Sequence, residues 1–185
     1  FCIFWYLGVA KNNTNVRRKE TLMKIVILER NSVGTDIDVE RFSDFGELTC
    51  YPVTVTEEEV AERIVDADIV IANKTPMNES SLKDAKNLKL ICEFATGYDN
   101  VDLDYCRKRG ILVANVRDYS TAAVAQHTFA MALFLLENLH YYDTYVKSGV
   151  YSNQPRFSNF DMPFVELEGK TWGIVGMGNI GKKVA

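Results

Sequence analysis

The chain has 185 residues, of which 47% are hydrophobic, and a formal net charge of −4 with acidic and basic residues interspersed. A chain of this length can build one good-sized core, or one domain and part of another. It has no basic stripe or arm, which disfavours a nucleic-acid partner, and no apolar run long enough to span a bilayer. We therefore expect a protein that acts without nucleic acid and without a membrane.

The cysteines and histidines limit the chemistry further. The four cysteines are widely spaced and form no C-x-x-C pair: Cys2, Cys50, Cys92 and Cys106. This spacing disfavours zinc and a disulfide framework and is typical of a reducing compartment. Only two histidines occur, His127 and His140, so a multi-histidine metal site cannot be built. We expect a cytoplasmic protein without a metal site.

The first 22 residues differ in character from the rest. The apolar run "FCIFWYLGVA" has no basic region before it, so the order is wrong for a signal peptide. Lys19 and Glu20 can be encoded by AAG-GAG, the bacterial ribosome-binding consensus, two codons before Met23. We hypothesise that residues 1–22 are a translated leader and that the native start is Met23. The alternative is a genuine N-terminal extension.

From Met23 onward, short apolar runs alternate with helical patterns. Strands are predicted at 24–28, 46–53, 68–73, 88–95 and 111–115. Helices are predicted at 35–44, 56–67, 78–87 and 101–110, with Thr56 as the cap of the second and Gly110 closing the last. Continuous hydrophobicity in the strands indicates a parallel sheet covered on both faces. The sequence therefore predicts an α/β, flavodoxin-like domain.

A long helix is predicted at 120–148, followed by a polar, aromatic-rich connection at 148–170. The first part of the helix is apolar nearly all round: Ala122, Ala123, Ala125, Phe129, Ala130, Met131, Phe134, Leu135 and Leu136. Such a helix must be covered on most sides, so we expect it to pack between domains or between subunits. A lone histidine in its first turns, His127, is more often a hydrogen-bonded core residue than a catalyst.

The C-terminal stretch "TWGIVGMGNIGKKVA" is predicted to be a strand, a glycine turn and the first residues of a helix. The turn has the pattern G-x-G-x-x-G, formed by Gly176, Gly178 and Gly181. In a dinucleotide site the first glycine permits the tight turn, the second lets the pyrophosphate approach, and the third lets the helix pack closely. Amides at the helix start, near Asn179 and Ile180, would bind the phosphates. An ordinary strand-to-helix turn is the alternative.

Two loops follow predicted strands, at the edge of the sheet where ligands meet this architecture. In "ATGYDN" (95–100) the amides of Thr96 and Gly97 could hold a small anion such as a carboxylate. The alternative is that Gly97 serves only the turn. In "ANKTPM" (72–77), Lys74 is either a solvated loop charge or a cation facing an acidic substrate. No general base stands out in the chain.

Three stretches, in this order, resemble the D-isomer-specific 2-hydroxyacid dehydrogenases. They are "NLKLICEFATGYDNVDLDYCRKRGILVANV", "YSTAAVAQHTFAMALFLL" and "LEGKTWGIVGMGNIGKKVA". The resemblance covers residues 23–185, and "NKTP" and "YYDTYVKSGVYS" look most like the glycerate dehydrogenase, or hydroxypyruvate reductase, type. It implies hydride transfer between NAD or NADP and a small 2-keto or 2-hydroxy acid, such as the reduction of hydroxypyruvate to D-glycerate.

The resemblance also implies roles for single residues. Thr96 and Gly97 match the loop whose amides hold the substrate carboxylate, and Lys74 lies in the other substrate-domain loop near the cleft. The residues that it assigns to the cofactor are Thr128, near the nicotinamide, and Gly176, Gly178, Asn179, Ile180 and Gly181, at the pyrophosphate. The helix at 120–148 matches the one that joins the domains and contributes to a dimer interface, so a homodimer is expected.

The domain organisation follows from the same resemblance. Residues 23–119 are expected to be the substrate domain, and residues 120–185 the interdomain helix and the truncated start of a Rossmann NAD-binding domain. The family's catalytic arginine, glutamate and histidine would follow Ala185, and His127 and His140 do not match that histidine. We therefore expect the N-terminal part of a longer enzyme, inactive alone and holding no catalytic residue.

A second hypothesis comes from a different class of protein. The same fold serves non-catalytic, NAD(H)-sensing binding proteins of the corepressor kind, and a fold alone does not settle function. A bare flavodoxin-like interaction domain is a third possibility, which the glycine turn at the end of the chain disfavours.

Overall fold

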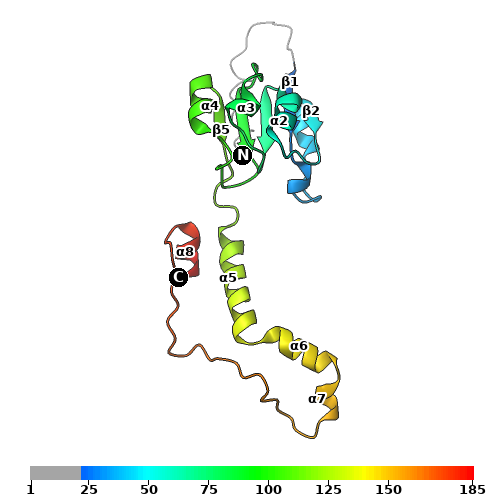
Figure 1. The fold of residues 1–185 in the computed structure, drawn as a ribbon, viewed down its shortest axis with the longest axis vertical. Coiled ribbons are helices and arrows are strands. Elements are labelled where there is room, and N and C mark those ends of the chain that lie inside the picture. Colours follow the sequence, from blue (N-terminus) through cyan, green and yellow to red (C-terminus); the bar gives the residue numbers. More distant parts are fainter. Residues whose placement is uncertain (1–21) are drawn as a thin grey trace. The chain divides into compact units, whose positions relative to one another are not determined.

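The structure is a computed structural model that describes residues 22–185. The hypothesis of a translated leader is made for residues 1–22, and residues 1–21 of it lie outside the described residues. The described part divides into two compact units, with the boundary between Arg117 and Asp118. Figure 1 shows the helices and strands of each unit.

The first unit is built on a parallel five-stranded sheet. Its strands are β1 (Met23–Ile27), β2 (Gly46–Cys50), β3 (Ile69–Ala72), β4 (Leu90–Glu93) and β5 (Leu112–Ala114). They lie in the order β2-β1-β3-β4-β5, and every pair is parallel. This is the flavodoxin-like order, so the predicted sheet is confirmed. The strand order reverses between β1 and β3. From β1 the chain first adds β2 at one side of β1 and then adds β3 at the other side.

Helices cover one face of this sheet. They are α2 (Glu57–Ile64), α3 (Glu79–Leu82) and α4 (Leu103–Arg109). Buried side chains from these helices and from the strands form one core: Val60, Ile64, Leu82 and Cys106 pack with Val26, Val70 and Ile91. The predicted helix at 78–87 is shorter than expected, because the chain leaves α3 through tight turns that bury Ala85 and Leu88 before β4.

Both predicted helix signals around these elements are confirmed. The hydroxyl of Thr56 accepts the N–H of Glu59, and the Glu59 carboxylate accepts the N–H of Thr56, which completes a capping box at the start of α2. Gly110 ends α4 with a φ of 71°, a left-handed conformation that glycine adopts without steric cost.

The opposite face of the sheet is covered by the 3-10 helix η2 (Glu40–Phe45), whereas the short 3-10 helix η1 (Arg30–Ser32) buries no residue. The prediction of a helix at 35–44 is therefore wrong in type and position. Val39, Phe42 and Phe45 recur every three residues and pack against the strand residues of this face. A period of three fits the 3-10 helix, which has three residues per turn.

The second unit holds α5 (Thr121–Leu136), α6 (Leu139–Lys147), α7 (Val150–Asn153) and α8 (Asn179–Val184). The single long helix predicted at 120–148 is wrong, because the chain breaks at Asn138. Asn138 has a φ of 51°, and its side chain donates a hydrogen bond to the Pro163 carbonyl at 3.1 Å. Asparagine tolerates this left-handed conformation better than most residues, which makes it a natural end for a helix.

The strand predicted at 171–175 is not formed, whereas the helix predicted after the glycines is present as α8. A strand needs a neighbouring strand for its N–H and C=O groups, and residues 118–185 contain no other strand. The segment instead packs through Trp172, whose ring stacks on Phe129 of α5 with centroids 5.2 Å apart. Within this unit α5 and α8 lie side by side (Figure 1).

Among residues 22–185, no helix is long and apolar enough to cross a membrane. The same residues contain no group of three or more His, Cys, Asp or Glu side chains that could hold a metal ion.

Candidate functional site

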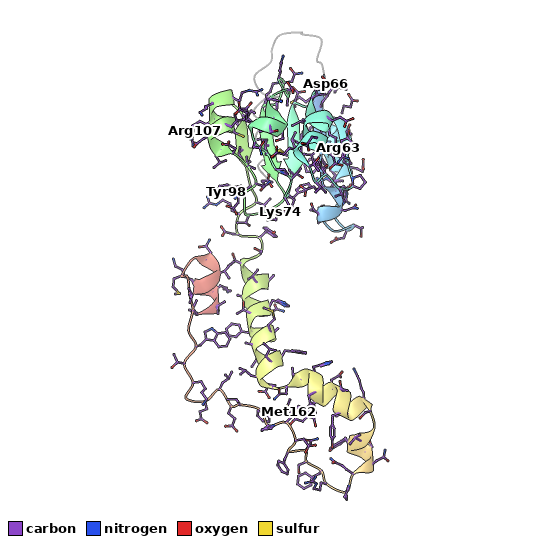
Figure 2. The ribbon with its side chains drawn as sticks, viewed as in Figure 1. Arg63, Asp66, Lys74, Tyr98, Arg107 and Met162 are labelled. Atoms are coloured by element: carbon purple, nitrogen blue, oxygen red, sulfur yellow. The ribbon has the colours of Figure 1, made fainter. Side chains whose placement is uncertain are left out.

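Three chain segments leave the carboxyl ends of neighbouring strands in the first unit. Glu29 follows β1, residues 73–77 follow β3, and residues 94–100 follow β4. Because the strands are parallel, these ends meet at one edge, where ligands bind in open α/β sheets. Figure 2 shows Lys74 and Tyr98 at the same end of the first unit, away from the end that carries Asp66.

The loop after β3 is held from below by Glu29. Its carboxylate oxygen Oε2 accepts the backbone N–H groups of Asn73, Lys74 and Thr75 at 2.7, 2.9 and 3.1 Å. Burial raises the pKa of Glu29, but hydrogen bonds from the Thr75 side chain and from these three amides outweigh it and lower the pKa on balance. The three amides therefore already bind an anion of the protein itself.

The side chain of Lys74, within this loop, is exposed. Within residues 22–185 its ammonium group makes no hydrogen bond or ion pair, so its charge is available to a ligand at this edge. The exposed position is compatible with both predictions for Lys74, a solvated loop charge and a cation facing an acidic substrate.

The turn after β4 presents open amides. Thr96 and Gly97 are exposed, and within residues 22–185 their backbone N–H groups donate to no protein acceptor. The turn is nevertheless fixed, because the Thr96 hydroxyl donates to the Val116 carbonyl at 2.8 Å and the Asn115 amide donates to the Thr96 carbonyl at 2.7 Å. A rigid turn with unused amides can bind a small anion.

Gly97 is not required by the turn itself. A Cβ atom on it would meet only Asp99 Oδ2 at 3.7 Å, which is an ordinary contact, and its φ is not in the left-handed region. A glycine in such a position leaves space for a ligand to approach the backbone.

Asn100 and Glu93 connect the two loops, and sequence analysis missed this role. The Asn100 side-chain amide donates to the Thr75 carbonyl at 2.9 Å and to Glu93 Oε1 at 3.2 Å. The backbone adds two bonds, from the Met77 N–H to the Asn100 carbonyl and from the Asp102 N–H to the Met77 carbonyl. The N-cap of α4 is Asp102, whose side chain accepts the Tyr105 N–H at 2.9 Å.

Glu93 is the last residue of β4 and only 1% exposed. Burial raises its pKa to about 7; the nearby charge of Glu29 acts in the same direction, while the Asn100 hydrogen bond and Lys74 oppose it. Its second oxygen, Oε2, has no hydrogen-bond partner among the described residues. The signal in the sequence was an acidic residue directly at the end of an apolar strand, as in "LICE" and "IVILE".

The glycine turn of the second unit has the geometry of a phosphate cradle. Gly176 has a φ of 97°, which favours glycine, and a Cβ on Gly181 would lie 2.0 Å from the Gly176 carbonyl oxygen. A Cβ on Gly178, in contrast, would meet nothing within 4 Å. Two glycines are thus required by the protein's own packing, and Gly178 leaves open space that a bound group could use.

The start of α8 offers amides beside this space. Gly178 is the N-cap and has no side chain to accept the first N–H groups of the helix, which include those of Asn179 and Ile180. The Asn179 side chain donates to Asp118 Oδ1 at 2.6 Å, which fixes the turn within its unit. The residues present therefore fit a dinucleotide pyrophosphate.

The remaining candidates lie on α5. Thr128 is half-buried, and its hydroxyl donates to the Val124 carbonyl at 2.8 Å, one helical turn earlier. His127 is exposed, so the expectation of a core histidine is wrong.

A parallel five-stranded sheet in flavodoxin-like order, followed by a glycine turn at a helix start, defines the class. The chain belongs to the D-isomer specific 2-hydroxyacid dehydrogenase family, whose catalytic domain matches residues 25–171. It is 37% identical over 163 residues to a hydroxypyruvate reductase from Blautia hydrogenotrophica, covering 86% of this chain and 51% of that protein. It is 36% identical over 162 residues to a glycerate dehydrogenase from Methylorubrum extorquens, covering 88% of this chain and 51% of that protein.

A solved structure gives the same result. The D-lactate dehydrogenase from Aquifex aeolicus, complexed with NAD and lactic acid, matches with a TM-score of 0.70 and 30% identity over 87% of this chain and 46% of that one. The chain spans about half the length of the curated relatives that it matches.

Proposed function

We propose that the whole protein that contains this chain is an NAD(P)-dependent D-2-hydroxyacid dehydrogenase that reduces a small 2-keto acid, such as hydroxypyruvate, to the D-2-hydroxy acid. The observation that carries the proposal is the exposed turn of Thr96 and Gly97, which offers two unused amides at the ligand edge of the sheet. The likeness to a hydroxypyruvate reductase and a glycerate dehydrogenase supports this substrate class.

The substrate carboxylate would bind at the amides of Thr96 and Gly97. The competing amides, those of residues 73–75, are occupied by the Glu29 carboxylate and are closed to a second anion. The ammonium group of Lys74 extends from the neighbouring loop and would add attraction for an acid at this edge.

The cofactor would be held by the glycine turn. Gly176 and Gly181 shape the turn, Gly178 leaves room for the pyrophosphate, and the N–H groups of Asn179 and Ile180 would bind its oxygens. Thr128 would lie beside the nicotinamide, as the family resemblance implies. NAD or NADP, when bound, supplies the hydride for the reaction.

We further propose a homodimer that uses α5 and α6, and a cytoplasmic location. Large apolar side chains of α5 are exposed, including Phe134 and Leu135. Cys50 and Cys106 are free thiols, as expected in a reducing compartment.

The activity can be tested on the protein expressed from its natural gene. We expect NADH or NADPH to be oxidised when hydroxypyruvate is added. Lys74→Met should raise the KM for hydroxypyruvate by about fivefold, since one cation near a carboxylate contributes on the order of 1 kcal/mol. Lys86→Met, the same change at an exposed lysine after α3, is the matched control.

A protein that binds NADH tightly but reduces no 2-keto acid would contradict this proposal and favour the corepressor-like alternative. The 185-residue chain alone is expected to show no turnover, because no residue in it matches the family's catalytic arginine, glutamate or histidine. Measurable reduction of hydroxypyruvate by that chain would overturn the assignment of catalysis to residues outside it.

A further inference from the structure

We propose that Asn100, oriented by Glu93, is a positioning residue that holds the Thr96 and Gly97 turn at a fixed spacing from the loop of Lys74. The proposal rests on the proposed function only where it assigns a substrate carboxylate to that turn. Nothing in the local sequence pattern requires an asparagine that links two loops, and its partner Thr75 lies 25 residues earlier in the chain.

Asn100 is held through its side-chain amide. A side-chain amide has two N–H donors, and here one is directed to the Thr75 carbonyl and the other to Glu93 Oε1. Both donors are therefore used, and together they fix the side chain between the loop after β3 and the end of β4. Removing the Glu93 acceptor would leave the amide with one anchor and permit it to rotate.

Glu93 is buried although its side chain is acidic. A carboxyl group that is 1% exposed is costly to bury, and its only hydrogen bond among the described residues is the one from Asn100. A valine or leucine at this position would extend the apolar strand at no such cost. The acidic side chain is thus explained by what it does to Asn100 and not by the packing of the core.

The loop of Lys74 is held on its other side as well. Glu29 binds the N–H groups of residues 73–75, while Asn100 binds the carbonyl of Thr75. The backbone around Lys74 is therefore held both through the N–H groups of residues 73–75 and through the Thr75 carbonyl. If both loops are fixed, the Lys74 ammonium group and the Thr96 and Gly97 amides can bind the same carboxylate without a further loss of conformational entropy.

The test uses the 185-residue chain and oxalate as the probe, with NMR titration of the Thr96 and Gly97 amide signals. Glu93→Gln and Glu93→Leu both remove the charge, but only glutamine keeps an acceptor for Asn100. We expect Glu93→Leu and Asn100→Ala to weaken oxalate binding by about tenfold, and Glu93→Gln to stay within about twofold of the unchanged chain. Asn87→Ala, at an exposed asparagine before β4, is the control.

The pH profile separates positioning from general loss of structure. The charged groups that face Glu93 are Glu29 and Lys74. As Glu93 ionises it adds a negative charge near the bound anion, so oxalate affinity should fall with rising pH in the unchanged chain and stay flatter in Glu93→Gln. Equal affinities for Glu93→Gln and Glu93→Leu over the whole pH range would overturn the proposal.

A measurement without any ligand tests the positioning role of Asn100 independently of the proposed substrate site. Amide hydrogen exchange at Met77 and Asp102, whose N–H groups join the two loops, should accelerate about tenfold in Asn100→Ala and not in Asn87→Ala. Exchange at Ile71 and Ile91 in the sheet should not change. Unaltered exchange at Met77 and Asp102 would refute the positioning role. Absence of oxalate binding in every chain, with the exchange effect present, would instead refute the substrate assignment.

Discussion

At the scale of single residues, the carboxyl ends of β1 and β4 hold acidic side chains that serve opposite electrostatic purposes. Glu29 is surrounded by donors, which lower its pKa and keep it charged. Glu93 has one donor and is buried, which raises its pKa to about 7. The difference arises from the number of N–H groups that each carboxyl group meets, because hydrogen bonds to the charged form compensate for lost hydration.

The raised pKa of Glu93 predicts how stability depends on pH. Between the ordinary value of 4.5 and about 7 the folded protein keeps a proton that the unfolded chain releases. The stability that this proton contributes is complete below 4.5 and is lost as the pH rises through 7. Relative to the unchanged chain, Glu93→Gln should therefore gain up to about 3 kcal/mol between roughly pH 4.5 and pH 8.

Urea unfolding of both chains at several pH values measures this difference. Glu47→Gln, at an exposed glutamate of β2, should give a difference that hardly depends on pH. A Glu93→Gln effect equal at both ends of the pH range would show that Glu93 is not protonated in the folded protein.

The candidate substrate residues could be found from the sequence, whereas their supports could not. Lys74, Thr96 and Gly97 directly follow strands that are predictable from their apolar runs, so the loops were identifiable. Glu29 binds residues 44 to 46 positions later. Contacts at such separation depend on the strand order, which no local pattern encodes.

At the scale of elements, α2 shows a local sequence signal that the structure reproduces. Thr56 and Glu59 exchange hydrogen bonds across the first turn, and acidic side chains occupy the turn where the helix dipole favours them. Thr56→Ala removes the acceptor for the Glu59 N–H and should destabilise the first unit by about 1 kcal/mol.

Thermal unfolding with Ser80→Ala as the reference change tests this prediction. Ser80 is exposed in α3, and in contrast to Thr56 it is not an N-cap residue. Equal melting temperatures for Thr56→Ala and Ser80→Ala would mean that the capping box adds nothing to stability.

The glycine turn permits a matched pair of substitutions. Gly181→Ala places a Cβ against the Gly176 carbonyl and should disrupt the turn, with loss of both the fold of this segment and cofactor binding. Gly178→Ala meets no protein atom, and φ there is −71°, so the fold should be unaffected. Only a bound pyrophosphate would collide with the added methyl group.

Calorimetric titration of NADH into the protein from its natural gene measures the effect. We expect Gly178→Ala to weaken NADH binding by at least about tenfold at an unchanged melting temperature. Unaltered NADH affinity would remove the pyrophosphate from this turn.

At the scale of the whole molecule, the second unit exposes more apolar surface than a solitary helical segment can keep in water. Large side chains of α5 are 40% exposed or more: Val124, Phe129, Met131, Leu133, Phe134 and Leu135. A helix that is apolar on most sides is normally buried by a partner. This observation supports the proposed dimer through α5 and α6.

The association can be tested by light scattering. Leu135 is 72% exposed, and Leu135→Lys should shift the mass of the 185-residue chain toward that of a monomer, because a charge is costly to bury in an apolar interface. Val55→Lys changes a similarly exposed residue of the first unit and should leave the mass unchanged. If the unchanged 185-residue chain is a monomer, the proposal that α5 and α6 form a dimer interface is contradicted.

The sequence by itself determined the parallel α/β architecture, the capped helix at Thr56 and the helix after the glycines. These features depend on signals within a few residues: apolar runs, caps and turn glycines. Only the tertiary structure decided that 171–175 forms no strand, that the helix breaks at Asn138, and that Glu29, Glu93 and Asn100 hold the loops after β3 and β4 by hydrogen bonds. Each of these depends on what partners a segment meets in space, and that is set by strand order and packing across distant parts of the chain.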